Sequence, residues 1–310
     1  MPADVISYGE LGVDNIIRVP HLPSPERAAF PVSDSYHVGG AAANCALWLA
    51  AWGVPVALTG NVIGDDELGQ QLLAWLAAYP ALDRRWLAVE TGAATPFCRI
   101  LVTPDAERTI LVFGYPESSV VPLDESMLAG VRFVSIDLYG GPERLAAARL
   151  ARQQGVTTVV NDVIDPAHAI LAWTDLVVNS AAYLRAAEPG VNVADRARRL
   201  QSASGATVVT TDGPDPIHVL RPDGTRFSVR PPAAEALVDA TGAGDAFRAG
   251  LIYGLLQDWE LAGSVRWGAA AGSLKVGRLG GGCRLPGLDQ LRAAAEQAVV
   301  DEAGLSLEPN

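Results

Sequence analysis

A loop of small residues that runs directly into an apolar helix is the feature of this sequence that most constrains its fold. Residues 240–246 read ATGAGDA, and the apolar residues of 246–256 predict a helix. Such a loop leaves the first backbone N–H groups of the helix unpaired, and together with the helix dipole they form an anion-binding site. Asp245 lies within this anion-binding site, where its negative charge would repel a bound anion. We therefore predict that Asp245 takes a proton from a hydroxyl group, while N–H groups of Gly242, Ala243 and Gly244 hold the developing negative charge.

Two simpler interpretations of this stretch remain open. Asp245 could be a helix cap that only ties down the first turn, although a simple cap does not need glycines at 242 and 244. The stretch also begins like the dinucleotide fingerprint GxGxxG, but the third glycine would fall at Phe247 and the stretch lies late in the chain.

Composition excludes several classes of function. The net charge of −12 argues against nucleic acid as a partner, because a phosphate backbone demands a basic face. Lys275 is the only lysine, so no P-loop sequence GxxxxGK[ST] exists. Cys45, Cys98 and Cys283 are scattered, which predicts neither a disulfide framework nor a zinc site and fits a reducing cytoplasm. We expect no signal peptide and no membrane association, because the N-terminus lacks a basic region and the apolar run 45–58 is too short to span a bilayer.

Buried strands alternate with helices along most of the chain, which predicts a doubly wound α/β fold with a mostly parallel sheet. Expected strands are 5–9, 131–136, 157–160, 176–178 and 206–213; expected helices are 145–154, 246–256 and 267–276. Asp14 follows the first strand, at the sheet edge where such folds gather ligands, although a loop cap explains it equally well.

Two segments do not fit the parallel sheet. Residues 16–19 and 30–32 read as short strands split by prolines, and residues 96–102 and 108–112 flank a turn at 103–107, which predicts a hairpin. Between them lies a nearly apolar helix, opened by Gly39 and Gly40 and closed by Gly53. Asn44 is its one polar side chain, so we expect Asn44 to face a polar ligand or a capped turn.

The two ends of the chain together resemble the ribokinase-like, or PfkB, family of carbohydrate and nucleoside kinases. The family's C-terminal signature, D-T-x-G-A-G-D, is similar to residues 239–245, with Ala240 at a position that more often holds threonine or proline. Its N-terminal signature is matched by Gly39, Gly40, Asn44 and Gly53, and the continuation 60–69 also fits. The resemblance implies a three-layer fold with helices on both faces of the sheet and a small β lid, formed by segments 15–37 and 93–118 within one domain of residues 1–310.

The resemblance also implies a set of site residues for ATP-dependent phosphorylation of a sugar hydroxyl. Asp245 would be the base and residues 242–244 the anion hole. The remaining residues fall into three groups: substrate-binding Asp14, Gly39, Gly40, Asn44 and Tyr139; nucleotide-binding Asn179, Thr211, Gly213 and Gly280; and metal-binding Asp239 and Thr241 for a monovalent cation such as K⁺, with Asp162 for Mg²⁺. Tyr139 also reads as a core or lid-packing tyrosine. A homodimer formed through the lid is expected, since lid strands have exposed edges.

The sequence departs from the family at several positions. Ala41 replaces a lysine found in ribokinase, which removes one sugar contact and argues against assuming ribose. Ala182 replaces the glutamate that helps to organise magnesium, Pro214 and Pro216 alter the nucleotide loop, and Gly268 replaces an asparagine. Besides a sugar kinase, a nucleoside kinase with the base stacked under Phe97 or Phe113 and a non-catalytic binding homologue therefore remain open.

Overall fold

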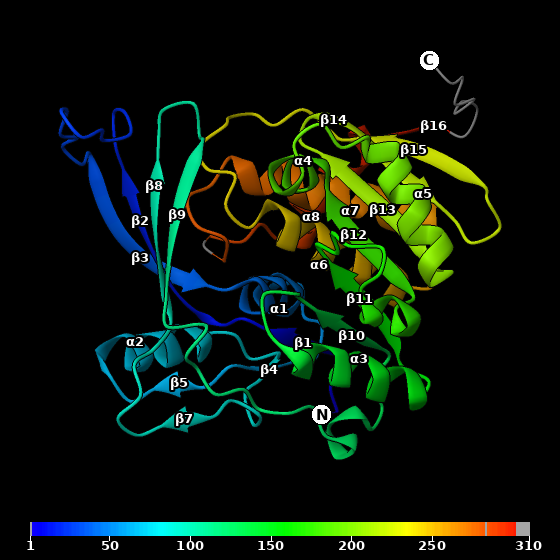
Figure 1. The fold of residues 1–310 in the computed structure, drawn as a ribbon, viewed down its shortest axis with the longest axis horizontal. Coiled ribbons are helices and arrows are strands. Elements are labelled where there is room, and N and C mark those ends of the chain that lie inside the picture. The colour runs from blue at the N-terminus through cyan, green and yellow to red at the C-terminus, as the bar shows by residue number, and fades with distance from the viewer. Residues whose placement is uncertain (1, 283, 302–310) are drawn as a thin grey trace.

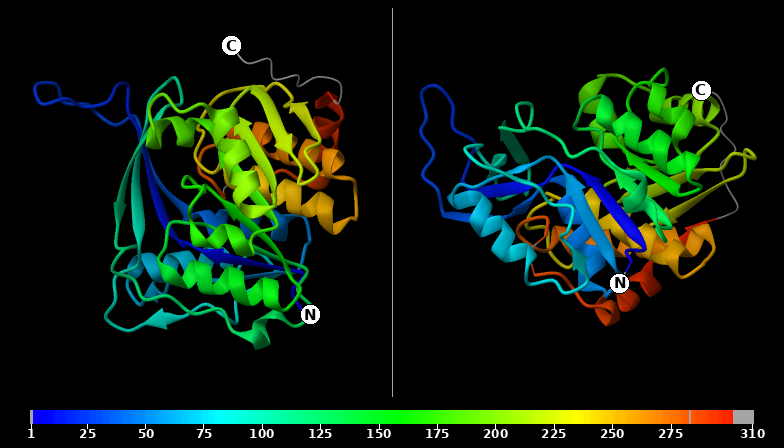
Figure 2. Two further views of the ribbon diagram at one scale, coloured as in Figure 1. Left: turned by 45° about the vertical axis from the view of Figure 1, so that its right-hand side comes forward. Right: turned by 90° about the horizontal axis from the view of Figure 1, so that it is seen from below.

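The computed structural model describes residues 2–282 and 284–301, and within them a large central sheet is flanked by helices on both faces (Figures 1 and 2). The sheet has the order β16-β15-β14-β13-β12-β11-β10-β1-β4-β6. Its strands are β1 (Val5–Gly9), β4 (Val56–Gly60), β6 (Leu82–Asp83), β10 (Phe133–Ile136), β11 (Thr157–Asn161), β12 (Leu176–Ser180), β13 (Thr207–Asp212), β14 (Asp215–Leu220), β15 (Arg226–Arg230) and β16 (Val299–Asp301). Neighbouring strands from β13 through β6 are parallel, and the pairs from β13 to β16 are antiparallel. The predicted doubly wound α/β fold is confirmed.

Helices cover the two faces of the central sheet and enclose two apolar cores. The helices are α1 (Ala41–Ala51), α2 (Glu67–Leu76), α3 (Pro142–Gln153), α4 (Ala181–Ala187), α5 (Val193–Ser204), α6 (Ala243–Leu256), α7 (Leu261–Val276) and α8 (Leu288–Gln297), with 3₁₀ helices η1 (Glu125–Leu128) and η2 (Ala169–Trp173). Helices α1, α2, α6, α7 and α8 pack in one core and α3 and α5 in the other. Strands such as β1 are buried throughout, because helices cover both of their sides.

Helices α6 and α7 approach one another unusually closely. A Cβ atom at Gly250 would lie 2.6 Å from the carbonyl oxygen of Trp267, and one at Gly268 would lie 2.8 Å from that of Phe247. Gly268 is therefore explained by helix packing, because any larger residue would push α7 away from α6. Helix α7 also begins six residues earlier than the predicted start at Trp267.

A second sheet of four strands stands to the left of the central sheet in Figure 1. It has the order β3-β2-β8-β9, with β2 (Gly12–Arg18), β3 (Ser33–Gly39), β8 (Phe97–Val102) and β9 (Arg108–Phe113); a separate pair joins β5 (Ile63–Gly64) to β7 (Val89–Glu90). The predicted hairpin corresponds to β8 and β9. The predicted strand at 30–32 is wrong, since the strand begins only at Ser33, beyond Pro31, which cannot donate a ladder hydrogen bond.

Asp14 lies on this second sheet and not in a loop. It is the third residue of β2, in register with His37 of β3 on one side and Cys98 of β8 on the other. Asp14 does follow the C-terminal end of the first strand, as predicted, but the alternative of a loop cap is wrong, because only Glu10 and Leu11 separate β1 from β2.

Two further expectations concern cysteines and membranes. Cys45 and Cys98 are free thiols, and Cys283 lies outside the described residues. Over the described part of the chain, every helix is too short or too polar to cross a lipid bilayer.

Candidate active site

The N-terminus of α6 holds Asp245 in its first turn without using it as a cap. Gly242 precedes the helix with φ 76°, a left-handed conformation that favours glycine, and no side chain caps the helix start. The N–H of Ala243 donates to the carbonyl of Ala240 at 3.2 Å, so it is engaged within the turn. The N–H groups of Gly242 and Gly244 donate to no atom of the described chain. The simple-cap interpretation of Asp245 is therefore excluded, and two of the three predicted anion-hole donors are available.

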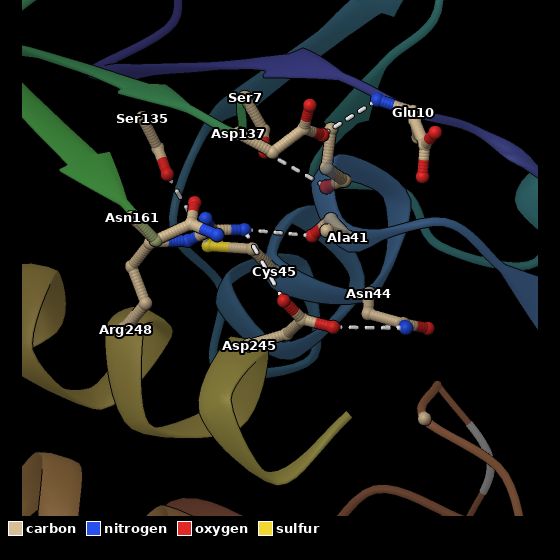
Figure 3. A network of polar contacts seen from close by, with 12 residues as sticks. Ser7, Glu10, Ala41, Asn44, Cys45, Ser135, Asp137, Asn161, Asp245 and Arg248 are labelled. Atoms are coloured by element: carbon tan, nitrogen blue, oxygen red, sulfur yellow. Dashed lines mark hydrogen bonds and ion pairs between the residues drawn. The ribbon is translucent and has the colours of Figure 1, made fainter. Parts of the chain in front are cut away.

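Asp245 is held between side chains from two helices (Figure 3). The amide nitrogen of Asn44, on α1, donates to Asp245 Oδ2 at 3.1 Å. Arg248 lies one turn further along α6, and its Nη2 is 3.4 Å from Asp245 Oδ1 and donates to the carbonyl of Ala41 at 2.8 Å. Arg248 is 2% exposed, so its charge is buried next to the carboxylate. The structure places Asn44 and Asp245 in one site, as the sequence predicted, whereas nothing in the sequence indicated that Arg248 contacts Asp245.

Two glycines before α1 make room for the carboxylate of Asp14. A Cβ atom at Gly39 would overlap Asp14 Oδ1, and one at Gly40 would overlap the carbonyl of Glu10. That carbonyl accepts the N–H groups of Ala42 and Ala43 at 3.1 and 3.3 Å and so closes the start of α1. Gly39 and Gly40 thus place Asp14 and the first turn of α1 next to one another.

Asp14 and Asp245 share one electrostatic environment. Burial raises the pKa of Asp14 to about 8, and the negative charges of Asp245 and Asp239 act in the same direction, while Lys275 opposes them. Burial raises the pKa of Asp245 to about 6, against the charge of Arg248 and the hydrogen bond from Asn44. A carboxyl group with a pKa near the working pH is suited to accept a proton from a hydroxyl group.

Further carboxylates that sequence reasoning missed lie at the same edge of the sheet. Asp137, directly after β10, accepts the N–H of Glu10 at 2.6 Å, and its other oxygen is 3.3 Å from Nε of the buried Arg144. Burial, followed by the charge of Asp137, raises the pKa of Glu10 to about 8, and Asp245 and Asp14 add to the effect. Glu10 and Asp137 follow neighbouring parallel strands, so their positions at strand ends were the available signal.

Two buried polar oxygen atoms, one on α1 and one just before α6, are a further feature of the site. Asn44 Oδ1 and Thr241 Oγ1 are buried without a hydrogen-bond partner in the described chain. Buried polar atoms are usually paired, so both oxygens are available to a bound molecule. A surface hollow of about 380 Å³ lies elsewhere, at the amino ends of the strands near Pro55 and Arg85, and contains none of these side chains.

The residues predicted to bind substrate and magnesium around Asp162 form a hydrogen-bonded group. The hydroxyl of Tyr139 donates to Asp162 Oδ2 at 2.7 Å, and Asn161 Nδ2 donates to the same oxygen at 2.8 Å. Burial and the charge of Asp162 raise the pKa of Tyr139 above its ordinary range. Asp162 raises the pKa of Asp245, so the two carboxylates lie close enough to interact. Within the described residues, no three acidic, histidine or cysteine side chains cluster as a metal site.

Most of the residues predicted to bind the nucleotide make hydrogen bonds to other parts of the chain. Both ends of the Asn179 side chain bond to the backbone of Val163, at 2.9 and 2.8 Å, so this side chain positions the loop that carries Asp162. Thr211 Oγ1 is 3.3 Å from the carbonyl of Asn179, and Gly213 lies in the turn between β13 and β14. The N–H of Gly280 donates to Asp239 Oδ2 at 2.8 Å.

Comparison with protein families identifies the chain. Residues 2–286 match the pfkB family of carbohydrate kinases, and the chain belongs to this family. It is accordingly a phosphotransferase with an alcohol group as acceptor. Similar proteins include a 5-dehydro-2-deoxygluconokinase of Geobacillus kaustophilus, 26% identical over 96% of this chain and 94% of that protein, and the ribokinase of Haemophilus influenzae, 26% identical over 90% and 94%.

Solved structures share the ribokinase fold. The ribokinase of Arabidopsis thaliana, complexed with ribose and ATP, superposes with a TM-score of 0.79 at 17% identity and covers 96% of this chain and 99% of its own. A nucleoside kinase of Burkholderia thailandensis in complex with inosine superposes with a TM-score of 0.74 at 19% identity, covering 94% and 96%. The resemblance drawn from the two signatures is confirmed for the family and for the fold.

Proposed function

We propose that the protein transfers the γ-phosphoryl group of ATP to a primary hydroxyl group of a sugar or sugar-like alcohol. The observation that supports this most is the meeting of Asp14, Asn44 and Asp245, which come from the second sheet, α1 and α6 and surround one buried polar environment. A carboxylate that is charged only above about pH 6 sits there beside helix-end N–H groups.

Asp245 is the base in this proposal. Its carboxylate takes the proton of the acceptor hydroxyl as the oxygen attacks, and Asn44 and Arg248 fix its orientation. The N–H groups of Gly242 and Gly244 stabilise the charge that develops on the transferred group. When bound, ATP supplies the phosphoryl group, and its Mg²⁺ offsets the charge of the phosphates.

Asp14 binds the hydroxyl groups of the acceptor. Its side chain is 3% exposed at the base of the second sheet, and Gly39 leaves it the space it needs. Asn44 Oδ1 remains free to accept a hydrogen bond from a second hydroxyl group. The second sheet acts as a lid that excludes water, which would otherwise compete as acceptor.

ATP binds along the carboxyl ends of β11 to β13 and the loop at Gly280. Thr211 and Gly213 face the phosphates, and Gly280 borders the adenine. With Ala182 in place of a glutamate, Mg²⁺ is held by phosphate oxygens, water and Asp162, in keeping with its preference for retained water ligands.

One experiment distinguishes the proposed sugar kinase from a nucleoside kinase and from a non-catalytic homologue. A thermal-shift panel of sugars, sugar acids and nucleosides with a non-hydrolysable ATP analogue finds the ligand class, and ATP consumption with each hit measures turnover. Stabilisation and turnover with sugars support the proposal, whereas turnover with nucleosides alone supports a nucleoside kinase. Binding without turnover in Mg²⁺ supports a non-catalytic homologue; Gly268 no longer favours that reading, because helix packing explains it.

We propose that two copies pair through the lid in a cytoplasmic homodimer, with neither nucleic acid nor a membrane as partner. The apolar residues Ile110, Leu111, Val112 and Phe113 of the edge strand β9 are 40–55% exposed. Such an apolar edge invites pairing with another chain. Light scattering should therefore give twice the monomer mass, and Val112→Glu should shift the protein toward the monomer.

A further inference from the structure

The only lysine of the chain lies inside the protein, at the position where a monovalent cation was predicted. Lys275 is in the last turn of α7 and is fully buried. Its Nζ donates to the carbonyl of Asp239 at 2.7 Å and to the carbonyl of Arg278 at 2.9 Å, and it lies 3.8 Å from Asp239 Oδ2. Two carbonyl oxygens and a carboxylate are the kind of ligands that would surround a bound alkali cation.

Asp239 has no oxygen atom left without a donor. Its Oδ1 accepts the N–H of Thr241 at 2.8 Å, its Oδ2 accepts the N–H of Gly280 at 2.8 Å, and its carbonyl accepts the ammonium of Lys275. Asp239, the charged member of the pair predicted to hold a monovalent cation, is therefore already engaged by donors from the chain, and only Thr241 Oγ1 has no partner among the described residues. The positive charge beside Asp239 is the ammonium group of Lys275, which belongs to the chain itself.

The same contacts connect this charge to the anion hole. Asp239 is 0% exposed, so its carboxylate needs a buried positive charge close by. Through Thr241 it holds the start of the turn that leads to Gly242, and through Gly280 it holds the glycine loop. A Cβ atom at Gly242 would lie only 2.6 Å from Gly281 Cα, so these two segments support one another directly.

We infer that the ammonium group of Lys275 does the work of a monovalent metal ion, so that this enzyme needs neither K⁺ nor a similar cation. The inference rests on the proposed kinase function. Lys275 is a positioning residue: it does not touch the substrate but keeps the N–H groups of Gly242 and Gly244 in place by neutralising Asp239 and holding its carbonyl.

The first test uses the unaltered protein. ATP turnover with an accepted sugar is measured in tetramethylammonium chloride and at rising KCl, with Mg²⁺ and ionic strength held constant. We expect kcat to change by less than about twofold, because no transition-state contact depends on added K⁺. Crystals soaked in RbCl should show no anomalous peak beside the Asp239 carbonyl. A several-fold activation by K⁺, or a Rb⁺ peak at Asp239, would overturn the inference.

The second test uses Lys275→Ala with Arg278→Ala as its matched control. Arg278→Ala removes a neighbouring cation, whose side chain donates to the Leu274 carbonyl, but retains the backbone carbonyl that Lys275 uses. We expect Lys275→Ala to lose on the order of tenfold or more in kcat in tetramethylammonium chloride, since small displacements of catalytic donors have such effects. K⁺ or NH₄⁺ should restore much of that loss, whereas Arg278→Ala should remain indifferent to both.

The outcomes separate this inference from the kinase proposal. If Lys275→Ala folds and its loss is not relieved by K⁺ or NH₄⁺, Lys275 is a structural residue only and the inference is wrong. If the variant does not fold, the K⁺ titration and the RbCl soak of the unaltered protein still decide. If the folded protein turns over no acceptor under any condition, the kinase proposal fails, and the RbCl soak alone reports on the cation.

Discussion

Replacement of Asp245 with asparagine removes one charge from the centre of the site while the shape of the side chain is kept. The asparagine carbonyl can still accept the hydrogen bond from Asn44, now 3.1 Å long, but the side chain cannot accept a proton. A general base contributes about 10²–10⁴ to the rate, or about 3–5 kcal/mol of transition-state stabilisation. We therefore expect kcat for ATP turnover to fall by about 10²–10⁴-fold.

The stability of Asp245→Asn should change much less than its rate. The buried guanidinium of Arg248 loses a charged partner at 3.4 Å, which costs on the order of 1–3 kcal/mol. Burial disfavours the Asp245 carboxylate itself, as its raised pKa shows, so removing that charge offsets part of the loss. Urea unfolding should therefore find a folded protein whose unfolding free energy differs by no more than about 2 kcal/mol.

Asp66→Asn is the matched control for this substitution. Asp66 caps α2 by accepting the N–H of Gly69 at 2.8 Å, the role that the simpler interpretation assigned to Asp245. Asparagine can keep the cap on Gly69 but cannot also accept the N–H of Thr95 on its second terminal atom, so Asp66→Asn should lose some stability, while its kcat should stay within about twofold because Asp66 makes no contact with Asp245 or Asn44 in the described chain. Near-normal turnover of Asp245→Asn, measured by ADP release with an accepted sugar, would refute the assignment of Asp245 as the base.

Three further predictions follow from the pKa values and the packing of the site. Because the pKa of Asp245 is about 6, kcat/KM should fall as the pH drops below that value, by about tenfold per pH unit; a pH-rate profile that stays flat down to pH about 5 would contradict this. The folded protein holds a proton on Asp14 up to about pH 8, whereas the unfolded chain releases it near pH 4. Its unfolding free energy should therefore decrease as the pH rises through this window, by at most about 1.4 kcal/mol per pH unit, and chemical denaturation should show a smaller slope for Asp14→Asn. Gly281→Ala should lower kcat on the order of 10–100-fold, because the new Cβ atom would overlap the side-chain amide of Asn44. Gly277→Ala is the control, since a Cβ atom there meets nothing closer than 3.5 Å, and its kcat should equal that of the unaltered protein.

The sequence was sufficient for the features that depend on local pattern. Runs of apolar residues placed β1, β10 and β11, and the small residues before α6 placed Asp245 beside free helix-end N–H groups. The two signatures also brought Asn44 next to Asp245 across a separation of 201 residues. Each of these follows from side-chain periodicity or from a short motif.

Features that depend on how distant segments pack together could not be predicted from the sequence. Asp14 belongs to a strand of the second sheet because β2 begins at Gly12, only three positions after the last residue of β1, a spacing that fits a loop equally well. The burial of Arg248 and Arg144 beside carboxylates could not be expected, because arginines within helical patterns are usually exposed. Lys275 was counted only as the residue that excludes a P-loop, since nothing local places its ammonium against Asp239, 36 positions earlier.

The central claim is that Asp14 and Asp245 serve one acceptor molecule in different ways, and calorimetry tests it most directly. The dissociation constant of an accepted sugar is measured for the unaltered protein, Asp14→Asn and Asp245→Asn, each in parallel with ATP turnover. We predict that Asp14→Asn weakens sugar binding by on the order of tenfold or more, as expected when a buried hydrogen bond between the carboxyl group and a sugar hydroxyl is lost. Asp245→Asn should bind the sugar within about threefold of normal while its turnover is lost. Unchanged sugar affinity in Asp14→Asn together with full turnover in Asp245→Asn would contradict the account.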